Sequence, residues 1–318
     1  MNRAVEILKN EGAIGFVKAM GRFAFYHFVL FGESISFCLY DRYGRRRKCI
    51  TVSVNGYRMK LDLRDKGICR DLFFNRVREK ESTKIYEKML KERRPKTVLD
   101  IGANIGYYAL LAGKYARKVY AFEPNPKNYG VLLDNIKLNG MENVEPLNLA
   151  VSDRDGEVRF LMDIEMCNRS RVAFDSPSEN NLEVVAKSVA VDSFVRENGI
   201  SVDVVRFDTE GYEYFILRGM KETIERDRPA MFLELHPLFV RQYGGSMEEI
   251  LKWLKDYTVK YLVIAEHSYL RRALYPLLGE YNKFRVFEPD MITDEMMKYP
   301  KLRDIVLNSF GFHVFLEG

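Results

Sequence analysis

Short apolar runs alternate with amphipathic stretches along most of the chain. Runs such as 97–101 and 203–207 are rich in Val, Leu, Ile and Phe and are followed by polar or glycine-containing turns, which is typical of strands buried on both faces. The predicted strands are 97–101, 118–122, 143–151, 157–162, 182–191, 203–207, 229–235, 259–265 and 311–316. The predicted helices include 105–116, 126–139, 192–198 and 246–256. This alternation predicts an α/β fold built around a sheet.

Turn and cap residues mark several element ends. Apolar and polar residues alternate on both sides of Asn55-Gly56, and this pair favours a tight β-hairpin because both residues can adopt positive φ. Asn139-Gly140 and Asn198-Gly199 are typical of helix ends. Asp192 is expected to cap the helix 192–198.

The first 31 residues are expected to form one or two helices. Residues 13–31 are rich in Phe, but charged residues interrupt the run, so it is a poor candidate for a membrane span. Two interpretations remain: an amphipathic segment, residues 1–31, in the plane of a membrane surface, or a helix packed on the domain or in a dimer interface. With the hairpin and a helix over 79–91, this segment forms a predicted N-terminal extension, residues 1–90, before an α/β domain over 91–318.

A glycine-rich turn after the strand 97–101 carries the clearest functional signal. Asp100 lies at the end of the apolar run, Gly102 and Gly106 follow it, and Glu123 ends the next strand. Glycine lets the backbone turn sharply and approach a ligand closely, and the amides at the start of the following helix can receive an anionic group. Glu123 can accept hydrogen bonds from a ribose diol. This strand–turn–helix–strand unit predicts a site for an adenosine-bearing cofactor.

The spacing of this turn narrows the choice of cofactor. The glycines are spaced Gly-x-x-x-Gly, and Asn104 occupies the position where a dinucleotide-binding fold has its middle glycine. Asp100 would also repel a pyrophosphate. The sequence therefore favours a cofactor with a cationic centre and no phosphate, such as S-adenosylmethionine (SAM), over a dinucleotide and over an ordinary turn that binds nothing.

Polar side chains also end two later strands. Asp208 and Glu210 end one, and Glu234 and His236 end the other. Because ligands of open α/β sheets bind beyond the carboxyl ends of the strands, we expect these four side chains near the methyl donor. The ionisation range of His236 suits a general base for an attacking hydroxyl. Asp208 and Glu210 could orient the acceptor, hold a divalent cation or simply cap the next helix.

Composition and charge add a second, basic region. Hydrophobic residues make up 47% and charged residues 30% of the 318 residues, as in a globular protein. Residues 1–96 contain 23 Lys and Arg against 11 Asp and Glu, although the whole chain carries only +5. This segment could face a membrane, a phosphate-bearing substrate carrier or nucleic acid, or be a solvated surface. The four cysteines lack metal spacing and no signal peptide is evident, which together indicate a cytoplasmic protein, peripheral at the inner membrane face if residues 1–31 bind lipid.

Seven motifs in order resemble the FkbM-type SAM-dependent methyltransferases, a class I methyltransferase family. The motifs are Asp100–Gly106, Tyr120–Asn125, Asp134–Gly140, Ala150–Asp153, Arg206–Gly211, Leu217–Gly219 and Glu234–His236. The resemblance covers about residues 80–240. It implies a Rossmann-like class I methyltransferase sheet, mostly parallel with the last strand antiparallel, and O-methylation of a sugar or polyketide hydroxyl.

The resemblance also implies which residues bind SAM. They are Asp100, Gly102, Ala103, Asn104, Gly106, Glu123, Pro124 and Asp208, with Ala150, Val151 and Ser152 beside the adenine. The family usually has Lys where this chain has Arg206, so the charge is kept but its geometry differs.

Three functions compete at this point. The leading hypothesis is O-methylation of a sugar, a glycan or a lipid-linked glycan precursor. RNA methylation is prompted by the basic segment, but base-amine methyltransferases commonly carry Asn/Asp-Pro-Pro-aromatic where this chain has Asp208-Thr-Glu-Gly211, and the two carboxylates would repel phosphate. A non-catalytic SAM-binding scaffold is the third, and the intact acids and glycines argue against it.

Overall fold

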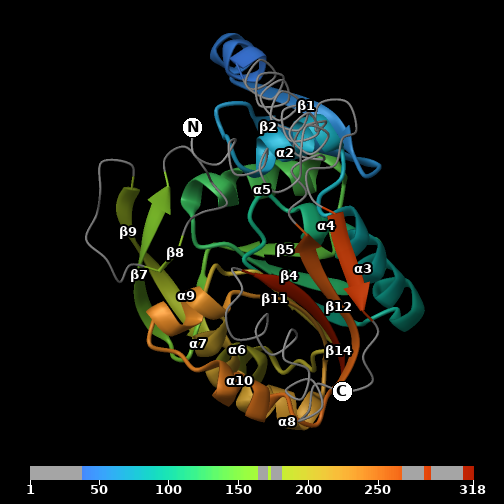
Figure 1. Ribbon diagram of the computed structural model, residues 1–318, viewed down its shortest axis with the longest axis vertical. Helices are drawn as coiled ribbons and strands as arrows, with labels where there is room; N and C mark the ends of the chain where they lie inside the picture. The colour runs from blue at the N-terminus through green and yellow to red at the C-terminus, as the bar shows by residue number, and fades with distance from the viewer. Residues whose placement is uncertain (1–37, 164–170, 173–180, 267–282, 288–310) are drawn as a thin grey trace, which may run out of the picture.

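A twisted eight-stranded sheet lies at the centre of the molecule (Figure 1). The computed structural model describes residues 38–163, 171–172, 181–266, 283–287 and 311–318. The predicted N-terminal helices and most of the polar loop 163–181 fall outside these ranges. In the described part of the chain, no helix is both long enough and apolar enough to cross a membrane.

The sheet is parallel over most of its width. In spatial order its strands are β13 (Lys283–Phe287), β12 (Thr258–Glu266), β14 (Phe312–Glu317), β11 (Ala230–Leu235), β10 (Val204–Phe207), β3 (Thr97–Ile101), β4 (Lys118–Phe122) and β5 (Val144–Leu147). All neighbours from β11 to β5 run parallel, and β14 is antiparallel to both β11 and β12. The predicted mostly parallel sheet with an antiparallel last strand is therefore confirmed. The edge strand β13 was not predicted; it pairs antiparallel with β12.

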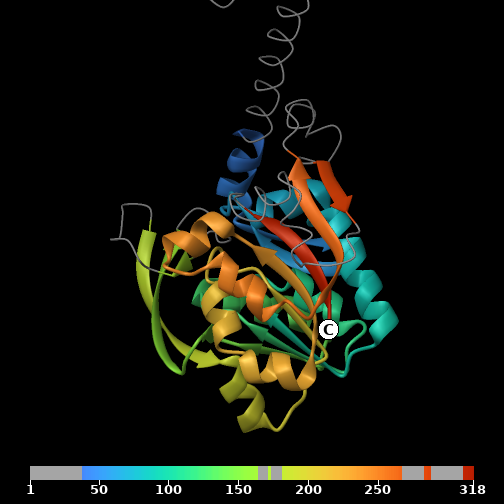
Figure 2. The same cartoon turned by 60° about the horizontal axis from the view of Figure 1, so that its bottom comes forward.

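Helices cover both faces of the sheet, as Figures 1 and 2 show from two sides. One face packs against α3 (Lys80–Arg93), α4 (Tyr107–Gly113) and α5 (Pro126–Leu138), and the other packs against α6 (Val191–Asn198), α7 (Glu213–Arg218), α8 (Lys221–Asp227) and α10 (Met247–Trp253). The structure also contains α2 (Ile68–Asn75) and α9 (Pro237–Gln242), and residues 38–47 are helical as well. Each face thus has its own apolar core.

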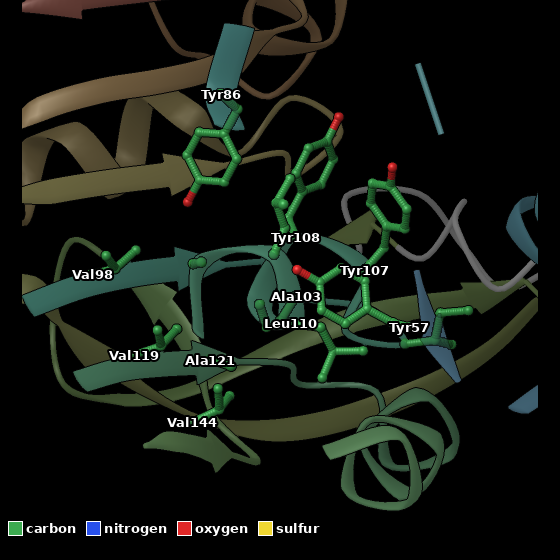
Figure 3. Close-up of a cluster of buried hydrophobic side chains, with 14 of the residues drawn as sticks. Tyr57, Tyr86, Val98, Ala103, Tyr107, Tyr108, Leu110, Val119, Ala121 and Val144 are labelled. Carbon is green, nitrogen blue, oxygen red and sulfur yellow. The ribbon is translucent and has the colours of Figure 1, made fainter. Parts of the chain in front are cut away.

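The period-two alternation of the strands decides which side chains share a face. Val98 and Val204 belong to the core under α4, whereas Leu99 belongs to the core on the other side. Figure 3 shows part of the first core, with Val98, Val119 and Val144 on neighbouring strands and with Tyr107 and Tyr108 at the start of α4. Asp100 and Arg206 come two residues after Val98 and Val204 in the same strands. They are paired in the parallel register. The same alternation that buries the valines therefore places this acid and this base side by side.

The predicted hairpin is confirmed. Strands β1 (Cys49–Val54) and β2 (Tyr57–Asp62) pair antiparallel, and Asn55 and Gly56 have φ of 46° and 84°. The α5 side chains attach the hairpin to the domain: Asn135 accepts a hydrogen bond from the Lys60 amide at 2.6 Å. A single apolar core cluster contains side chains of both the hairpin and the sheet.

Two local predictions were wrong. The single strand expected over 143–151 is two strands: β5 ends at Leu147, and β6 (Ala150–Ser152) joins a separate four-stranded sheet. Asn148 divides them, because its side-chain amide donates to the Glu123 and Pro124 carbonyls instead of continuing the ladder. The other strands of the small sheet are β7 (Gly156–Asp163), β8 (Arg171–Val172) and β9 (Asn181–Ala190).

The second error concerns Asp192. Its carboxylate does not cap its own helix α6; it accepts hydrogen bonds from the Glu222 and Thr223 amides at 3.1 and 2.8 Å. These amides lie in the first turn of α8, where backbone donors have no partner within the helix. Asp192 therefore caps a helix that begins about 30 residues later.

Candidate active site

A pocket opens at the carboxyl ends of β3, β4 and β10. Most of the predicted cofactor and catalytic residues line it: Gly102, Ala103, Asn104, Glu123, Pro124, Ala150, Val151, Asp208 and Glu210. Asp100, Gly106, Ser152 and His236 are not among the lining residues. Most of the residues predicted from the sequence motifs therefore line one pocket. The other four do not form part of its lining.

The two glycines of the turn are required by close backbone packing. Gly102 has φ of 76°, and a Cβ there would clash with the Asp208 carbonyl oxygen. Gly106 has φ of 95°, and its Cβ would lie 2.7 Å from a methyl group of Leu132 on α5. Positive φ disfavours a side chain at both positions; at Gly102 the clash is with backbone, whereas at Gly106 it is with the end of a side chain that can shift. Gly102 thus brings the β3 loop against the β10 loop, whereas Gly106 seats the start of α4 on α5.

Glu123 is held rigidly at one end of the pocket. Its Oε2 accepts a hydrogen bond from the Asn104 amide at 2.8 Å, and its Oε1 accepts one from the Asn125 amide at 2.9 Å. A carboxylate offers about four acceptor positions, so further donors can still bind. Burial raises the pKa of Glu123 to about 7, against the lowering effect of the backbone amides. A donor from a ligand would stabilise the ionised form.

Asp100 lies behind the turn and is paired with Arg206. The Asp100 side chain is 0% exposed, and its Oδ1 accepts a hydrogen bond from Arg206 Nη1 at 3.1 Å. Burial raises the pKa of Asp100, and the guanidinium opposes that rise. Because the Arg206 guanidinium already compensates the Asp100 charge, Asp100 does not by itself repel a pyrophosphate. This corrects the expectation that Asp100 would exclude a dinucleotide. The ionisable groups that do line the pocket are Arg78, Glu123, Arg206, Asp208 and Glu210, together with tyrosines.

Arg206 also ties the two sides of the pocket together. The same Nη1 donates to the Gly102 carbonyl at 3.1 Å, and Nη2 donates to Asp208 Oδ2 at 3.2 Å. Its guanidinium lies 4.4 Å from the ring centroid of Tyr108, in cation–π contact. The planar fork of Arg serves these partners at once, which the single ammonium of a Lys cannot do with the same geometry.

Of the three residues predicted to lie beside the adenine, two line the pocket and the third contacts a lining residue. Ala150 and Val151 of β6 line the pocket. Ser152 does not; its hydroxyl is 3.0 Å from the Tyr212 hydroxyl, and Tyr212 does line the pocket. Ser152 therefore acts indirectly, by fixing the position of Tyr212.

The predicted acid–histidine cluster forms at the other end of the pocket. Ligand atoms of Asp208, Glu234 and His236 lie within 4.8 Å of one another. His236 Nε2 is 3.5 Å from Glu234 Oε1 and 3.8 Å from Glu210 Oε2. The convergence expected from the strand ends is confirmed. Burial raises the pKa of Glu210 to about 7 and that of Asp208 to about 6.

His236 has an environment that favours its charged form. Its Nδ1 is 2.9 Å from Glu213 Oε1, and Glu234 approaches the other ring nitrogen. Burial alone would lower the pKa of His236, but the Glu213 and Glu234 carboxylates outweigh it and raise the pKa well above 6.5. An imidazolium at neutral pH has no lone pair to accept a proton. This geometry therefore argues against the predicted general-base role of His236.

Sequence reasoning missed four residues of the cluster: Arg78, Glu79, Glu213 and His313. His313 on β14 stands opposite Glu234 in the strand register, and its Nε2 is 3.1 Å from Glu234 Oε2 and 3.3 Å from Glu79 Oε2. Burial lowers the pKa of His313, yet Glu234 and Glu79 raise it to about 10. One signal was available, because His313 interrupts an otherwise apolar strand.

Arg78 joins this cluster from the segment after α2. Its Nη2 lies 2.9 Å from Glu79 Oε1 and 3.5 Å from Asp208 Oδ2. No spacing rule connects Arg78 with Asp208, since 130 residues separate them. Asp208 is thus held between two guanidinium groups.

The predicted divalent cation has candidate ligands. Besides Asp208, Glu234 and His236, the side chains of Glu79, Glu234 and His313 form a second group with ligand atoms within 4.8 Å. Glu234 is common to both groups. The same oxygens already face Arg78, Arg206 and the two imidazoles, so the described groups compensate much of the charge themselves.

The sequence is similar to a family of known proteins. The sequence profile of the Methyltransferase FkbM domain matches residues 100–261. The hexuronic acid methyltransferase AglP of Haloferax volcanii is 29% identical over 141 residues, which cover 43% of this chain and 55% of AglP. The tRNA(Phe) (4-demethylwyosine(37)-C(7)) aminocarboxypropyltransferase of Methanocaldococcus jannaschii is 41% identical over 68 residues, covering 21% of this chain and 26% of that protein. The chain thus spans about half, or less, of these curated relatives.

Among solved structures, the methyltransferase FkbM from Methylobacillus flagellatus superposes with a TM-score of 0.37 and 15% identity. That alignment covers 61% of this chain and 44% of the other. TYW2 of M. jannaschii, solved in complex with AdoMet, gives a TM-score of 0.36 and 16% identity over 85% of this chain and 86% of the other.

Proposed function

The chain belongs to the FkbM methyltransferase domain family, and we propose that it is a SAM-dependent O-methyltransferase acting on a hydroxyl of a sugar or a lipid-linked glycan. The single observation that carries the proposal is one pocket that is lined both by Glu123, which follows β4, and by the Asp208–Glu210 pair, which follows β10. The relative AglP, named a hexuronic acid methyltransferase, supports a sugar acceptor.

The residues of the pocket fit SAM. Glu123 still has acceptor capacity for a ribose hydroxyl beside its hydrogen bonds from the Asn104 and Asn125 amides and from the Asn128 side chain. Val151 and its apolar neighbours offer a surface for a purine. The three acids that line the pocket, Glu123, Asp208 and Glu210, outnumber its two arginines, Arg78 and Arg206, which favours a cationic sulfonium over a phosphate. When bound, SAM would supply the methyl group; the chain's own groups must bind the acceptor and take its proton.

Glu210 is the residue that we assign as general base. It lines the pocket, and its pKa of about 7 leaves a large ionised fraction at neutral pH. Asp208 is less free to accept a proton because Arg206 and Arg78 both face its Oδ2. In the proposed step the Glu210 carboxylate would take the hydroxyl proton while the acceptor oxygen bonds to the methyl carbon, and the methyl–sulfur bond of SAM would break to release S-adenosylhomocysteine. Asp208 orients the acceptor hydroxyl.

His236 then acts as a positioning residue. Its charged ring, held by Glu213, lies 3.8 Å from Glu210 and stabilises the ionised carboxylate. Removing that charge with His236→Asn is expected to raise the pKa of Glu210. The acid limb of the pH–rate profile would shift to higher pH, a change that a purely structural role would not produce.

Methyl transfer from radiolabelled SAM to a panel of sugar nucleotides and lipid-linked sugars tests the proposal. For an active acceptor, kcat/KM is expected to rise with pH through about 7 as Glu210 ionises. Glu210→Gln is expected to lower kcat by about 10²–10⁴-fold and to abolish that limb. Glu145→Gln, an exposed acid on β5, is the matched control. Full activity of Glu210→Gln would contradict the assignment.

RNA modification is the second candidate, favoured by the short match to a tRNA-modifying enzyme and the basic segment. Transfer to tRNA but to no sugar would replace the leading proposal. Calorimetric titration with SAM separates both from a scaffold that binds nothing, and the transfer assay separates them from a scaffold that only binds SAM. We expect Glu123→Ala to weaken binding about 10–100-fold for each hydrogen bond that is lost, because a hydrogen bond to a charged group contributes about 1.5–3 kcal/mol. Glu145→Ala should bind normally, and no heat with the wild type would favour a protein that does not use SAM.

A further inference from the structure

Two large apolar side chains are exposed on one short helical segment. In the described ranges, the large hydrophobic residues that are exposed are Leu39 at 61%, Tyr43 at 42% and Val185 at 56%. Leu39 and Tyr43 belong to helix 38–47 and are four residues apart, so they lie on the same face. This helix is at the top end of the molecule in both views (Figures 1 and 2).

An aromatic cluster continues this apolar surface onto α2. The Phe73 ring centroid lies 5.3 Å from that of Tyr40, 6.2 Å from that of Tyr43 and 5.1 Å from that of Phe74. Leu39, Tyr40, Tyr43, Phe73 and Phe74 border a shared surface depression. Phe73 and Phe74 are half-buried. The helix and α2 therefore present one contiguous apolar area with aromatic edges.

Basic side chains surround this area. Arg42, Arg45, Arg46, Arg47 and Lys48 are all exposed, and Arg42 and Arg46 border the same depression. Asp41 is the one acid in the sequence from 38 to 48. Exposed apolar side chains with cations beside them suit the interface of an anionic bilayer, where the cations meet lipid phosphates and the apolar groups enter the acyl boundary.

We propose that this basic–aromatic patch, formed by residues 38–48 with Phe73 and Phe74, docks the protein on an anionic membrane surface. A nucleic acid would satisfy the cations but would leave the Leu39 side chain without an apolar environment. The patch is also coupled to the pocket, because α2 carries Phe73 at one end and the pocket-lining Ile68 at the other. Docking here would hold the pocket close to a membrane. The inference does not depend on the proposed methyl transfer.

Co-sedimentation of the full chain with phosphatidylcholine vesicles, with and without phosphatidylglycerol, tests the proposal. We expect binding only to the anionic vesicles, and weaker binding with added salt. Each basic residue near an anionic surface contributes about fivefold, so the triple variant Arg45→Glu, Arg46→Glu, Arg47→Glu should bind about a hundredfold less or weaker still. The matched control Lys91→Glu, Lys187→Glu, Lys255→Glu changes the net charge equally on other exposed surfaces and should bind like the wild type.

The apolar contribution has its own variant. Leu39→Ser with Tyr43→Ser is expected to weaken binding to anionic vesicles, whereas Val185→Ser, an equally exposed apolar residue on β9, should not. Circular dichroism and thermal unfolding show whether each variant is folded. Equal loss in the two triple variants would mean that net charge alone attracts the protein and would overturn the proposal. Binding of tRNA without binding of anionic vesicles would overturn it too.

Discussion

Removing the Arg206 side chain should expose the cost of a buried, unpaired charge. In Arg206→Met the guanidinium is lost, and with it the hydrogen bonds to Asp100, the Gly102 carbonyl and Asp208. Asp100 is 0% exposed, so water cannot replace the lost partner. Breaking a buried ion pair by removing one partner costs about 3–5 kcal/mol, against a total stability of about 5–15 kcal/mol for a typical domain.

The double variant Arg206→Met, Asp100→Asn isolates the charge effect. With both charges absent, no uncompensated ion remains in the core, and we expect part of the stability to return, with a coupling energy of about 1–3 kcal/mol. Arg206→Lys should lie between wild type and Arg206→Met, because it keeps the charge without the planar fork. Arg196→Met, at a side chain that is 64% exposed and faces the 78% exposed Glu222, is the control and should change stability by no more than about 0.5 kcal/mol.

Urea unfolding of these four variants, of the single variant Asp100→Asn that completes the cycle, and of the wild type gives these free energies. The loss in Arg206→Met should also shrink as the pH falls, because a buried Asp100 without its partner can take up a proton and become neutral. Strictly additive effects of the Arg206 and Asp100 substitutions, or a loss in Arg206→Met no larger than in Arg196→Met, would refute the reasoning.

Three further predictions concern single side chains. Burial raises the pKa of Glu123 to about 7, so the stability contributed by its protonated form is fully present below about pH 4.5 and is lost as the pH rises to about 7. The free energy of unfolding of the wild type, measured in urea, should therefore fall by on the order of 3 kcal/mol over this range, and that of Glu123→Gln should not. Glu213→Gln should lower the pKa of the His236 imidazole, measured by NMR titration, and an unchanged pKa would contradict the ion pair. Gly102→Ala should destabilise the protein and weaken SAM binding measured by calorimetry, because the new Cβ meets the Asp208 carbonyl; Gly140→Ala, which meets no neighbour at a similar positive φ, separates the clash from the backbone strain.

The fold was largely predictable because its signals are local. The strand 97–101, the Asn55-Gly56 turn and the helix end at Asn139-Gly140 depend on residues within a few positions, and the structure contains all three. The two errors, at 143–151 and at Asp192, arose where a side chain forms its hydrogen bonds with a segment about 25 to 30 residues away. Local patterns carry no information about such partners.

The sequence by itself determined the apolar strands, the glycine turn, and the set of polar residues that end the strands at one edge of the sheet. Only the tertiary structure decided which of these polar groups are charged and which reach the pocket. The pKa of His236 is raised because Glu213 lies 2.9 Å from one ring nitrogen and Glu234 approaches the other. Ionisation in a buried site depends on distances of a few ångströms between groups far apart in the chain. Those distances are set by strand register and by the packing of the helices on the sheet.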